Sequence, residues 1–378
     1  MQPSSPSTRP QRRTLSSNVL AKAGWVGVLG VSTLLYTACA QGEALDDGMA
    51  AASIDDRSSG LAPRRVIQGN TVVDIVSPGG NAIEIVYESY CDIVVDGGAC
   101  ATSNACEVAC PTATNTAAYE NMGVFLGCFD DLFGRDSYDG NGGELRAVVE
   151  TSAFLAPLWS GNEAILSDPW GVYEGDPASS LDTVVHEFTH GVILHTVVDP
   201  QVGPESYPLN EGIADVFAAV CSWWNLRPAA PDASVWQISE DVLSNPNDLS
   251  DPASVASVSD HYLDDGNDKG VVGLAFYLLS EGGSHPRPQD HPGGPNVVGI
   301  GIESAARIFY RALELLPPNA TFSDMRIATN WAAFQLYPSA PGVMTSVNEA
   351  WNAVGVMCEI DPDPGSWLWC SLCGPCPQ

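Results

Sequence analysis

Basic residues are scarce in this chain of 378 residues. Lysine and arginine together number 15, against 46 aspartates and glutamates, and the formal net charge at neutral pH is −31. Such a surface repels the phosphates of nucleic acids and the headgroups of anionic lipids, so the charge argues against nucleic acid as a partner. The carboxylates favour solubility, and they also offer the oxygen ligands that Ca²⁺ prefers.

A long, uninterrupted apolar run is also missing near the start of the chain. The apolar stretch at residues 21–38 is short and contains three glycines, which argues against a stable membrane-spanning helix. It follows a basic segment at residues 9–13, as in a targeting sequence. Residues 1–40 therefore predict a signal peptide or a lipoprotein signal, in which Cys39 would carry the lipid. We expect an exported protein, either extracellular or anchored by a lipid to the bacterial outer envelope.

The cysteines support export. The chain has eleven, and removal or lipidation of Cys39 leaves ten. Cys221 stands apart from two clusters, which are Cys91, Cys100, Cys106, Cys110 and Cys128, and Cys358, Cys370, Cys373 and Cys376. Clusters of this kind in an exported chain predict disulfides, although the spacing does not fix their pairing. The alternative for the second cluster is a metal or iron–sulfur site at residues 370–376.

The pattern along the chain predicts an α+β fold with a change of character near residue 180. Residues 41–65 are polar and predict a flexible linker. Residues 66–180 predict a β-rich lobe with a Cys-rich loop, residues 181–357 a helical lobe, and residues 358–378 a Cys-rich tail. Strands are expected at 71–76, 83–87, 145–152 and 164–166, and helices at 181–192, 209–224, 270–279, 303–316, 322–336 and 345–354. Ser323 is a candidate helix cap.

The sequence His186-Glu187-Phe188-Thr189-His190 carries the most specific chemistry in the chain. Residues four apart on a helix lie on one face, so the two imidazoles can converge on one tetrahedral zinc ion. Glu187 lies beside the first ligand and can reach an attacking water as general base. The alternative is a pair of surface histidines. The apolar residues around the motif weigh against that interpretation.

A zinc site for catalysis needs a third protein ligand and one open position. Glu211 fits this role, because it lies on a second predicted helix at a suitable distance along the chain. Asp215 is one helical turn further and can accept the free ring N–H of a ligand histidine.

At these residues the chain resembles the thermolysin family of zinc metallopeptidases. The resemblance runs from residue 137 to 356 and includes the blocks 137–141, 158–161, 181–192, 209–217, 236–242, 274–283 and 297–315. It implies a two-lobed fold with the active site in the cleft between a β-rich lobe and a helical lobe. It also implies that His186, His190 and Glu211 bind zinc, that Glu187 is the base, and that Asp215 and Asn210 orient the ligand histidines.

The chain departs from the family at the groups that hold the oxyanion. The family's tyrosine falls near Gln201 or Val202, and Tyr207 is a nearby substitute. The family's histidine precedes the helix at Gly270, where the loop is shorter here. Either that histidine is deleted or His261 takes its role. Asn247 replaces an arginine near the first specificity pocket, and the substrate-pairing edge strand contains Ala156-Pro157, whose proline has no backbone donor.

The family's calcium sites are incomplete in this sequence. Asp182, Glu240 and Asp241 match, but Ser222 and Gln237 stand where carboxylates are expected. Calcium binding is therefore doubtful, and disulfides can supply stability in its place.

These observations leave two functions open. The first is a monomeric zinc-dependent endopeptidase that acts on proteins or peptides. The second is a zinc-binding surface protein with weak or no catalysis, used for adhesion or peptide capture, which the altered oxyanion residues motivate. The complete ligand and base set favours the enzyme, because a purely structural zinc site closes its fourth position.

Overall fold

A mixed β-sheet precedes the helical part of the chain. The computed structural model describes residues 64–76, 84–96, 99–103, 113–149, 156–166, 173–197, 203–227, 231–255, 258–262 and 269–357. Six strands form the sheet: β1 (Arg64–Val76), β2 (Glu84–Asp96), β3 (Ala99–Ser103), β4 (Leu145–Val149), β5 (Leu158–Trp159) and β6 (Ala164–Leu166). Their order is β3-β2-β1-β4-β6-β5, with β4 parallel to both β1 and β6 and the other pairs antiparallel. The sheet therefore ends at the short strand β5.

Helix α3 (Ala113–Phe133) lies in a region where the sequence analysis expected only a Cys-rich loop. Met122, Phe125 and Phe129 are fully buried, and their spacing of three and four residues places them on one helical face. The helix packs against β1 and β4 on one side and against the later helices α4 and α5 on the other. Cysteines and polar residues surround this apolar face, so the helical spacing of its apolar residues was not recognised in the sequence.

The helical part agrees with the predicted periodicity. Its helices are α4 (Leu181–Thr196), α5 (Ser206–Leu226), α6 (Lys269–Glu281), α7 (Ile302–Leu313), α8 (Phe322–Leu336) and α9 (Pro341–Ala353). One detail is different: the cap of α8 is Thr321 rather than Ser323. The side chains of Thr321 and Asp324 each bond to the other's backbone N–H, which forms a capping box.

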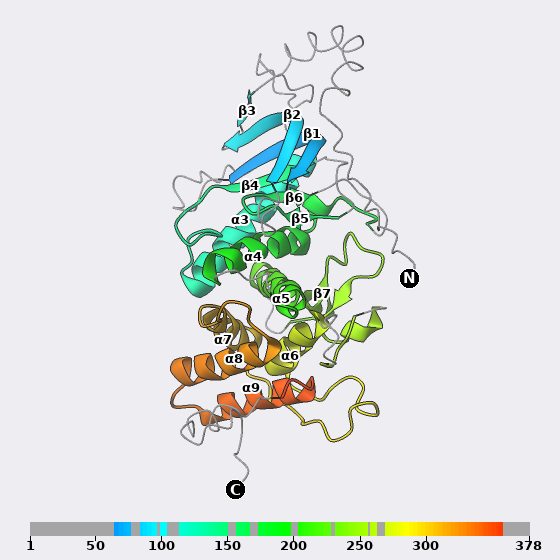
Figure 1. Ribbon diagram of the computed structural model, residues 1–378, viewed down its shortest axis with the longest axis vertical. Coiled ribbons are helices and arrows are strands. Elements are labelled where there is room, and N and C mark those ends of the chain that lie inside the picture. The colour runs from blue at the N-terminus through cyan, green and yellow to red at the C-terminus, as the bar shows by residue number, and fades with distance from the viewer. Residues whose placement is uncertain are drawn as a thin grey trace, which may run out of the picture. The chain divides into compact units, whose positions relative to one another are not determined.

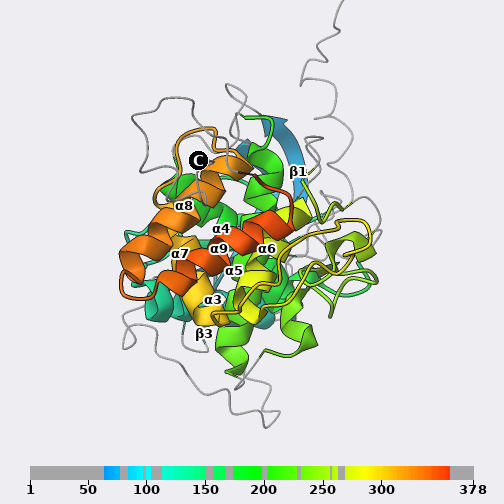
Figure 2. The same ribbon diagram turned by 90° about the horizontal axis from the view of Figure 1, so that it is seen from below.

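Helices α4 and α5 lie side by side in the middle of the described part, as Figure 1 shows. On the sheet side α4 contacts β5, β6 and α3, whereas α5 contacts α6 and α7. Helix α9 contacts α6 and α8, and Figure 2 shows it from below among the later helices. The α+β fold predicted from the sequence is confirmed, and its two central helices are those that carry the zinc motif residues.

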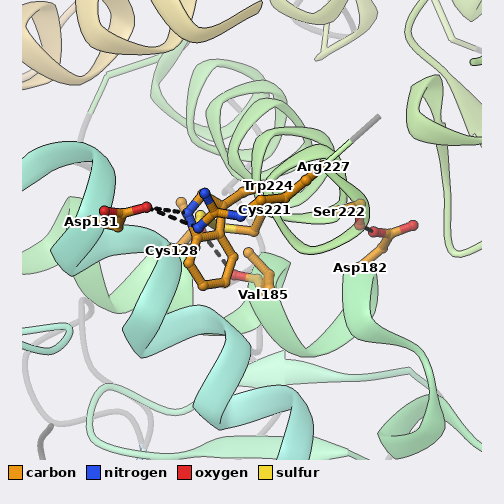
Figure 3. The surroundings of a disulfide bond; sticks show 9 residues. Cys128, Asp131, Asp182, Val185, Cys221, Ser222, Trp224 and Arg227 are labelled. Carbon is orange, nitrogen blue, oxygen red and sulfur yellow. Dashed lines mark hydrogen bonds and ion pairs between the residues drawn. A yellow bond between two sulfur atoms is a disulfide. The ribbon is translucent and has the colours of Figure 1, made fainter. Parts of the chain in front are cut away.

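A disulfide between Cys128 and Cys221 joins α3 to α5 (Figure 3). Both cysteines are fully buried, and the sequence had suggested that Cys221 stands alone. Beside the disulfide, Trp224 and Arg227 each donate a hydrogen bond to Asp131 of α3, at 2.8 and 3.0 Å. The end of α5 is therefore tied to α3 by one covalent link and two hydrogen bonds.

Several predictions concern residues outside the described ranges. These are the signal segment with Cys39, the linker up to residue 63, the oxyanion position near Gln201 and Val202, and the Cys-rich tail. Among the described residues, the helices fall short of the length and apolar character that a membrane span requires.

Candidate active site

His186 and His190 project from the same face of α4. Ser180 caps this helix by accepting a hydrogen bond from the backbone N–H of Thr183. This cap fixes the start of the helix ahead of the motif. The spacing of four residues brings the two Nε2 atoms to 3.1 Å from each other. The rings meet almost perpendicularly, at 88°.

Glu211 reaches the two imidazoles from α5. Its carboxylate oxygens lie 3.7 Å from Nε2 of His186 and 3.6 Å from Nε2 of His190. Ligand atoms around a tetrahedral zinc ion with bonds of 2.0–2.2 Å lie roughly 3.3–3.6 Å apart. The three side chains form a group able to hold a metal ion, and their donor set of two nitrogens and one carboxylate suits zinc.

Asp215 and Asn210 hold the opposite edge of each imidazole. Nδ1 of His186 lies 2.8 Å from Oδ1 of Asp215, and Nδ1 of His190 lies 3.1 Å from Oδ1 of Asn210. Because these oxygens accept a ring N–H, each imidazole in its neutral form leaves the lone pair of Nε2 directed at the other imidazole and at Glu211. The hydrogen bonds therefore fix the tautomer that metal binding needs.

Glu187 is buried beside this cluster and points into the same cavity. Its Oε2 is buried and has no hydrogen-bond partner among the described residues. Burial, together with the charges of Glu211 and Asp215, raises the pKa of Glu187 to about 8 against the opposing effect of His186. An unpaired carboxylate oxygen with a raised pKa in a cavity is what a general base requires.

The two imidazoles differ in their affinity for a proton. Burial opposes the charged form of His186, but its bond to Asp215 and the charges of Asp215, Glu211 and Glu187 raise its pKa to about 9. Burial and the charge of His186 lower the pKa of His190 to about 4. Since two charged rings 3.1 Å apart would repel each other, an additional proton in the metal-free protein is held on His186 rather than on His190.

A cavity of about 500 Å³ opens over these side chains. One wall consists of β5 with the preceding Ala156 and Pro157, and α6 contributes Lys269. Tyr207 lines the cavity with an exposed fraction of 69%, and Tyr173 lines it from a segment paired with Leu243. Burial and the charges of Glu187, Asp215 and Glu211 raise the pKa of Tyr173 to about 12.

Tyr173 and Lys269 were not candidates from the sequence. Neither residue belongs to a sequence motif. The fold brings each of them to the cavity from a segment outside α4 and α5. Asn247, which the sequence did flag, donates a hydrogen bond to Asp215 at 3.2 Å.

His261, the sequence candidate for an oxyanion donor, does not line this cavity. Its ring stacks on that of His291, with centroids 4.0 Å apart, and faces His285 at 6.2 Å. The structure therefore does not bring His261 to the zinc ligands.

Asp260, His285 and His291 form a second group with metal-ligand atoms close together. Here Arg287 already contacts Asp260 and Asp251. Both ring nitrogens of His285 bond to backbone atoms, at 3.1 and 3.2 Å. The carboxylate of Asp260 and the ring nitrogens of His285 are therefore already engaged in ion pairs and hydrogen bonds.

The calcium candidates Asp182, Glu240 and Asp241 line a separate cavity of about 130 Å³. Asp182 accepts hydrogen bonds from the Ser222 hydroxyl and from the backbone N–H of Ser239 (Figure 3 shows the former). Burial and the nearby charges of Glu240 and Asp241 raise the pKa of Asp182 to about 8, against those hydrogen bonds. Gln237 turns instead toward Asp248.

Two family models match this chain. The thermolysin metallopeptidase catalytic domain matches residues 101–194, and the thermolysin metallopeptidase alpha-helical domain matches residues 203–356. The first match includes His186, Glu187 and His190, and the second includes Glu211.

Among curated proteins, a bacillolysin of Bacillus caldolyticus is 33% identical over 257 residues, which is 63% of this chain and 45% of the relative. A thermolysin of Alicyclobacillus acidocaldarius is also 33% identical, over 63% of this chain and 44% of the relative. The chain thus spans slightly less than half the length of these curated relatives. The precursor of protealysin, a metalloproteinase from Serratia proteamaculans, has a similar solved structure, with a TM-score of 0.57 and 22% identity. That match covers 79% of this chain and 88% of the other.

Proposed function

Because the chain belongs to the thermolysin-like family of metallopeptidases, we propose that it is a zinc-dependent endopeptidase that cleaves proteins or peptides. One observation carries the proposal. Three ligand atoms spaced for a single zinc ion share a cavity with the unpaired Oε2 of Glu187. A purely structural zinc site would have no use for such a carboxylate.

His186, His190 and Glu211 would hold the zinc ion, which supplies Lewis-acid polarisation of the scissile carbonyl. Asp215 and Asn210 keep both imidazoles oriented through their Nδ1 atoms. Glu187 takes a proton from the attacking water as the water oxygen adds to the carbonyl carbon. It then gives this proton to the amide nitrogen as the C–N bond breaks.

Domain limits and location are part of the same proposal. A β-rich lobe at residues 66–180 and a helical catalytic lobe at 181–357 agree with the change in element type near Leu181. Export fits a peptidase that acts outside the cell, either free or held by a lipid at Cys39, and we expect a monomer. Calcium would bind weakly at Asp182, Glu240 and Asp241, because serine and glutamine replace two carboxylates.

The function is tested by comparing wild type with Glu187→Gln, both loaded with zinc, on casein and a quenched fluorescent peptide. Loss of the base should lower turnover by about 10²–10⁴-fold. Glu303→Gln, an exposed glutamate on α7, serves as the matched control and should leave turnover unchanged. Equal turnover of wild type and Glu187→Gln would refute the proposal. No hydrolysis of a broad peptide library by zinc-loaded wild type would favour the surface-protein alternative.

A further inference from the structure

Lys269 is unusual both in the sequence and in the cavity. Lysine occurs only twice in the chain, at positions 22 and 269, and the net charge is −31. Among the described residues that line the cavity, Lys269 is the only lysine or arginine, and it stands there with Glu187, Glu211 and Asp215. A lone cation in this setting is therefore not part of a basic surface.

Close backbone packing fixes Lys269 next to the zinc ligands. A Cβ atom at Gly212, the residue after Glu211, would lie 2.6 Å from the carbonyl oxygen of Lys269. A Cβ atom at Gly270 would lie 2.4 Å from both Pro252 and the Ser259 carbonyl oxygen. The two glycines thus allow the start of α6 to pack closely against α5, Pro252 and Ser259, and this packing holds Lys269 at the cavity.

The ammonium group has unused hydrogen-bonding capacity. It carries three N–H donors. No hydrogen bond or ion pair joins it to another side chain or backbone group within the described ranges. Its charge acts on Asp215. Burial opposes ionisation of that carboxyl, but the bond to His186 and the charges of His186 and Lys269 hold its pKa below the ordinary value. The two oxygens of Asp215 are already occupied by His186 and Asn247.

A bound peptide has the hydrogen-bond acceptors that the ammonium group of Lys269 needs as partners. An extended peptide bound in this cavity, which β5 and the start of α6 line, would offer its backbone carbonyl oxygens to the walls. A hydrogen bond from an ammonium group to a carbonyl oxygen is stronger in a partly dehydrated cavity than in water. We propose that Lys269 is a substrate-binding residue whose ammonium group donates a hydrogen bond to a main-chain carbonyl oxygen of the peptide. This inference rests on the proposed peptidase function.

The test measures binding without turnover. Full-length, zinc-loaded Glu187→Gln is titrated with a fluorescein-labelled peptide that the wild type cleaves, and the Kd is obtained from fluorescence anisotropy. Adding Lys269→Met should weaken binding by about 10–100-fold, the range for loss of one charged hydrogen bond. Lys269→Arg should restore most of the affinity. Arg311→Met is the matched control, because it removes one positive charge from an exposed site outside the cavity.

Zinc content and the unfolding midpoint are measured for each variant. Lys269→Gln provides a second uncharged variant if Lys269→Met does not fold. Unchanged peptide affinity in a folded, zinc-loaded variant would overturn the proposal. So would a loss of affinity that follows a loss of zinc, since Lys269 would then act only through Asp215. Failure of the peptidase proposal is seen separately, as equal turnover of wild type and Glu187→Gln.

Discussion

Two buried acids beside the same histidine have opposite electrostatic environments. Glu187 has an oxygen without a partner and a pKa raised to about 8, whereas both oxygens of Asp215 are hydrogen-bonded and its pKa is lowered. A carboxylate that is permanently ionised orients an imidazole, and one that exchanges its proton near neutrality can serve as a base. The difference in hydrogen bonding thus supports the separate roles that we propose for Glu187 and Asp215.

Asp215→Asn tests the orienting role. The amide cannot accept the Nδ1–H of His186 with a full negative charge, so zinc affinity should fall by about 10–100-fold. The measurement is competition for zinc with a chromophoric chelator, with Asp232→Asn at an exposed helix cap as the control. Wild-type zinc affinity in Asp215→Asn would show that Asp215 does not support the metal.

The convergence of His186 and His190 was predictable from the sequence because the geometry of a helix fixes residues four apart on one face. The approach of Glu211 to these histidines could also be inferred, because Glu211 lies on α5, the helix that follows α4 in the sequence. Lys269 and Tyr173 were not predictable, because their place depends on loops and on close packing at Gly212 and Gly270. His261 was a reasonable candidate by sequence, yet the path of the chain carries it to His285 and His291.

At the scale of elements, apolar periodicity located the six helices after residue 180 to within a few residues. The same rule failed for α3, whose buried face includes Cys128 and which lies where only a Cys-rich loop was expected. The pairing of Cys128 with Cys221 was also hidden, because 93 residues separate the two cysteines and only the packing of α3 on α5 brings them together.

The disulfide should contribute substantially to stability. Replacing both cysteines, Cys128→Ala with Cys221→Ala, should lower the free energy of unfolding by about 2–4 kcal/mol, because the open chain gains conformational freedom when unfolded. Urea unfolding of the zinc-loaded protein measures the loss, and peptide mapping without reduction checks the link. An unchanged unfolding midpoint, or a map without the Cys128–Cys221 peptide pair, would contradict this prediction.

At the scale of the whole molecule, stability should depend on the protonation of Asp182. Its pKa in the folded protein is about 8, above its ordinary value of 3.8, so the native state keeps a proton that the unfolded chain releases. The stabilisation is therefore complete at low pH and is lost as the pH rises from about 4 through 8. Asp182→Asn should flatten the decline in the urea midpoint between pH 5 and 8. The same decline in variant and wild type would assign it to other groups.

The proposed function depends on three side chains from α4 and α5 that would hold one zinc ion. A crystal structure of the zinc-loaded protein, with anomalous data collected on both sides of the zinc absorption edge, tests this directly. We predict one strong anomalous peak at about 2.0–2.2 Å from Nε2 of His186, Nε2 of His190 and a carboxylate oxygen of Glu211. An anomalous map with no peak between these three side chains, or with zinc bound only elsewhere, would contradict the account.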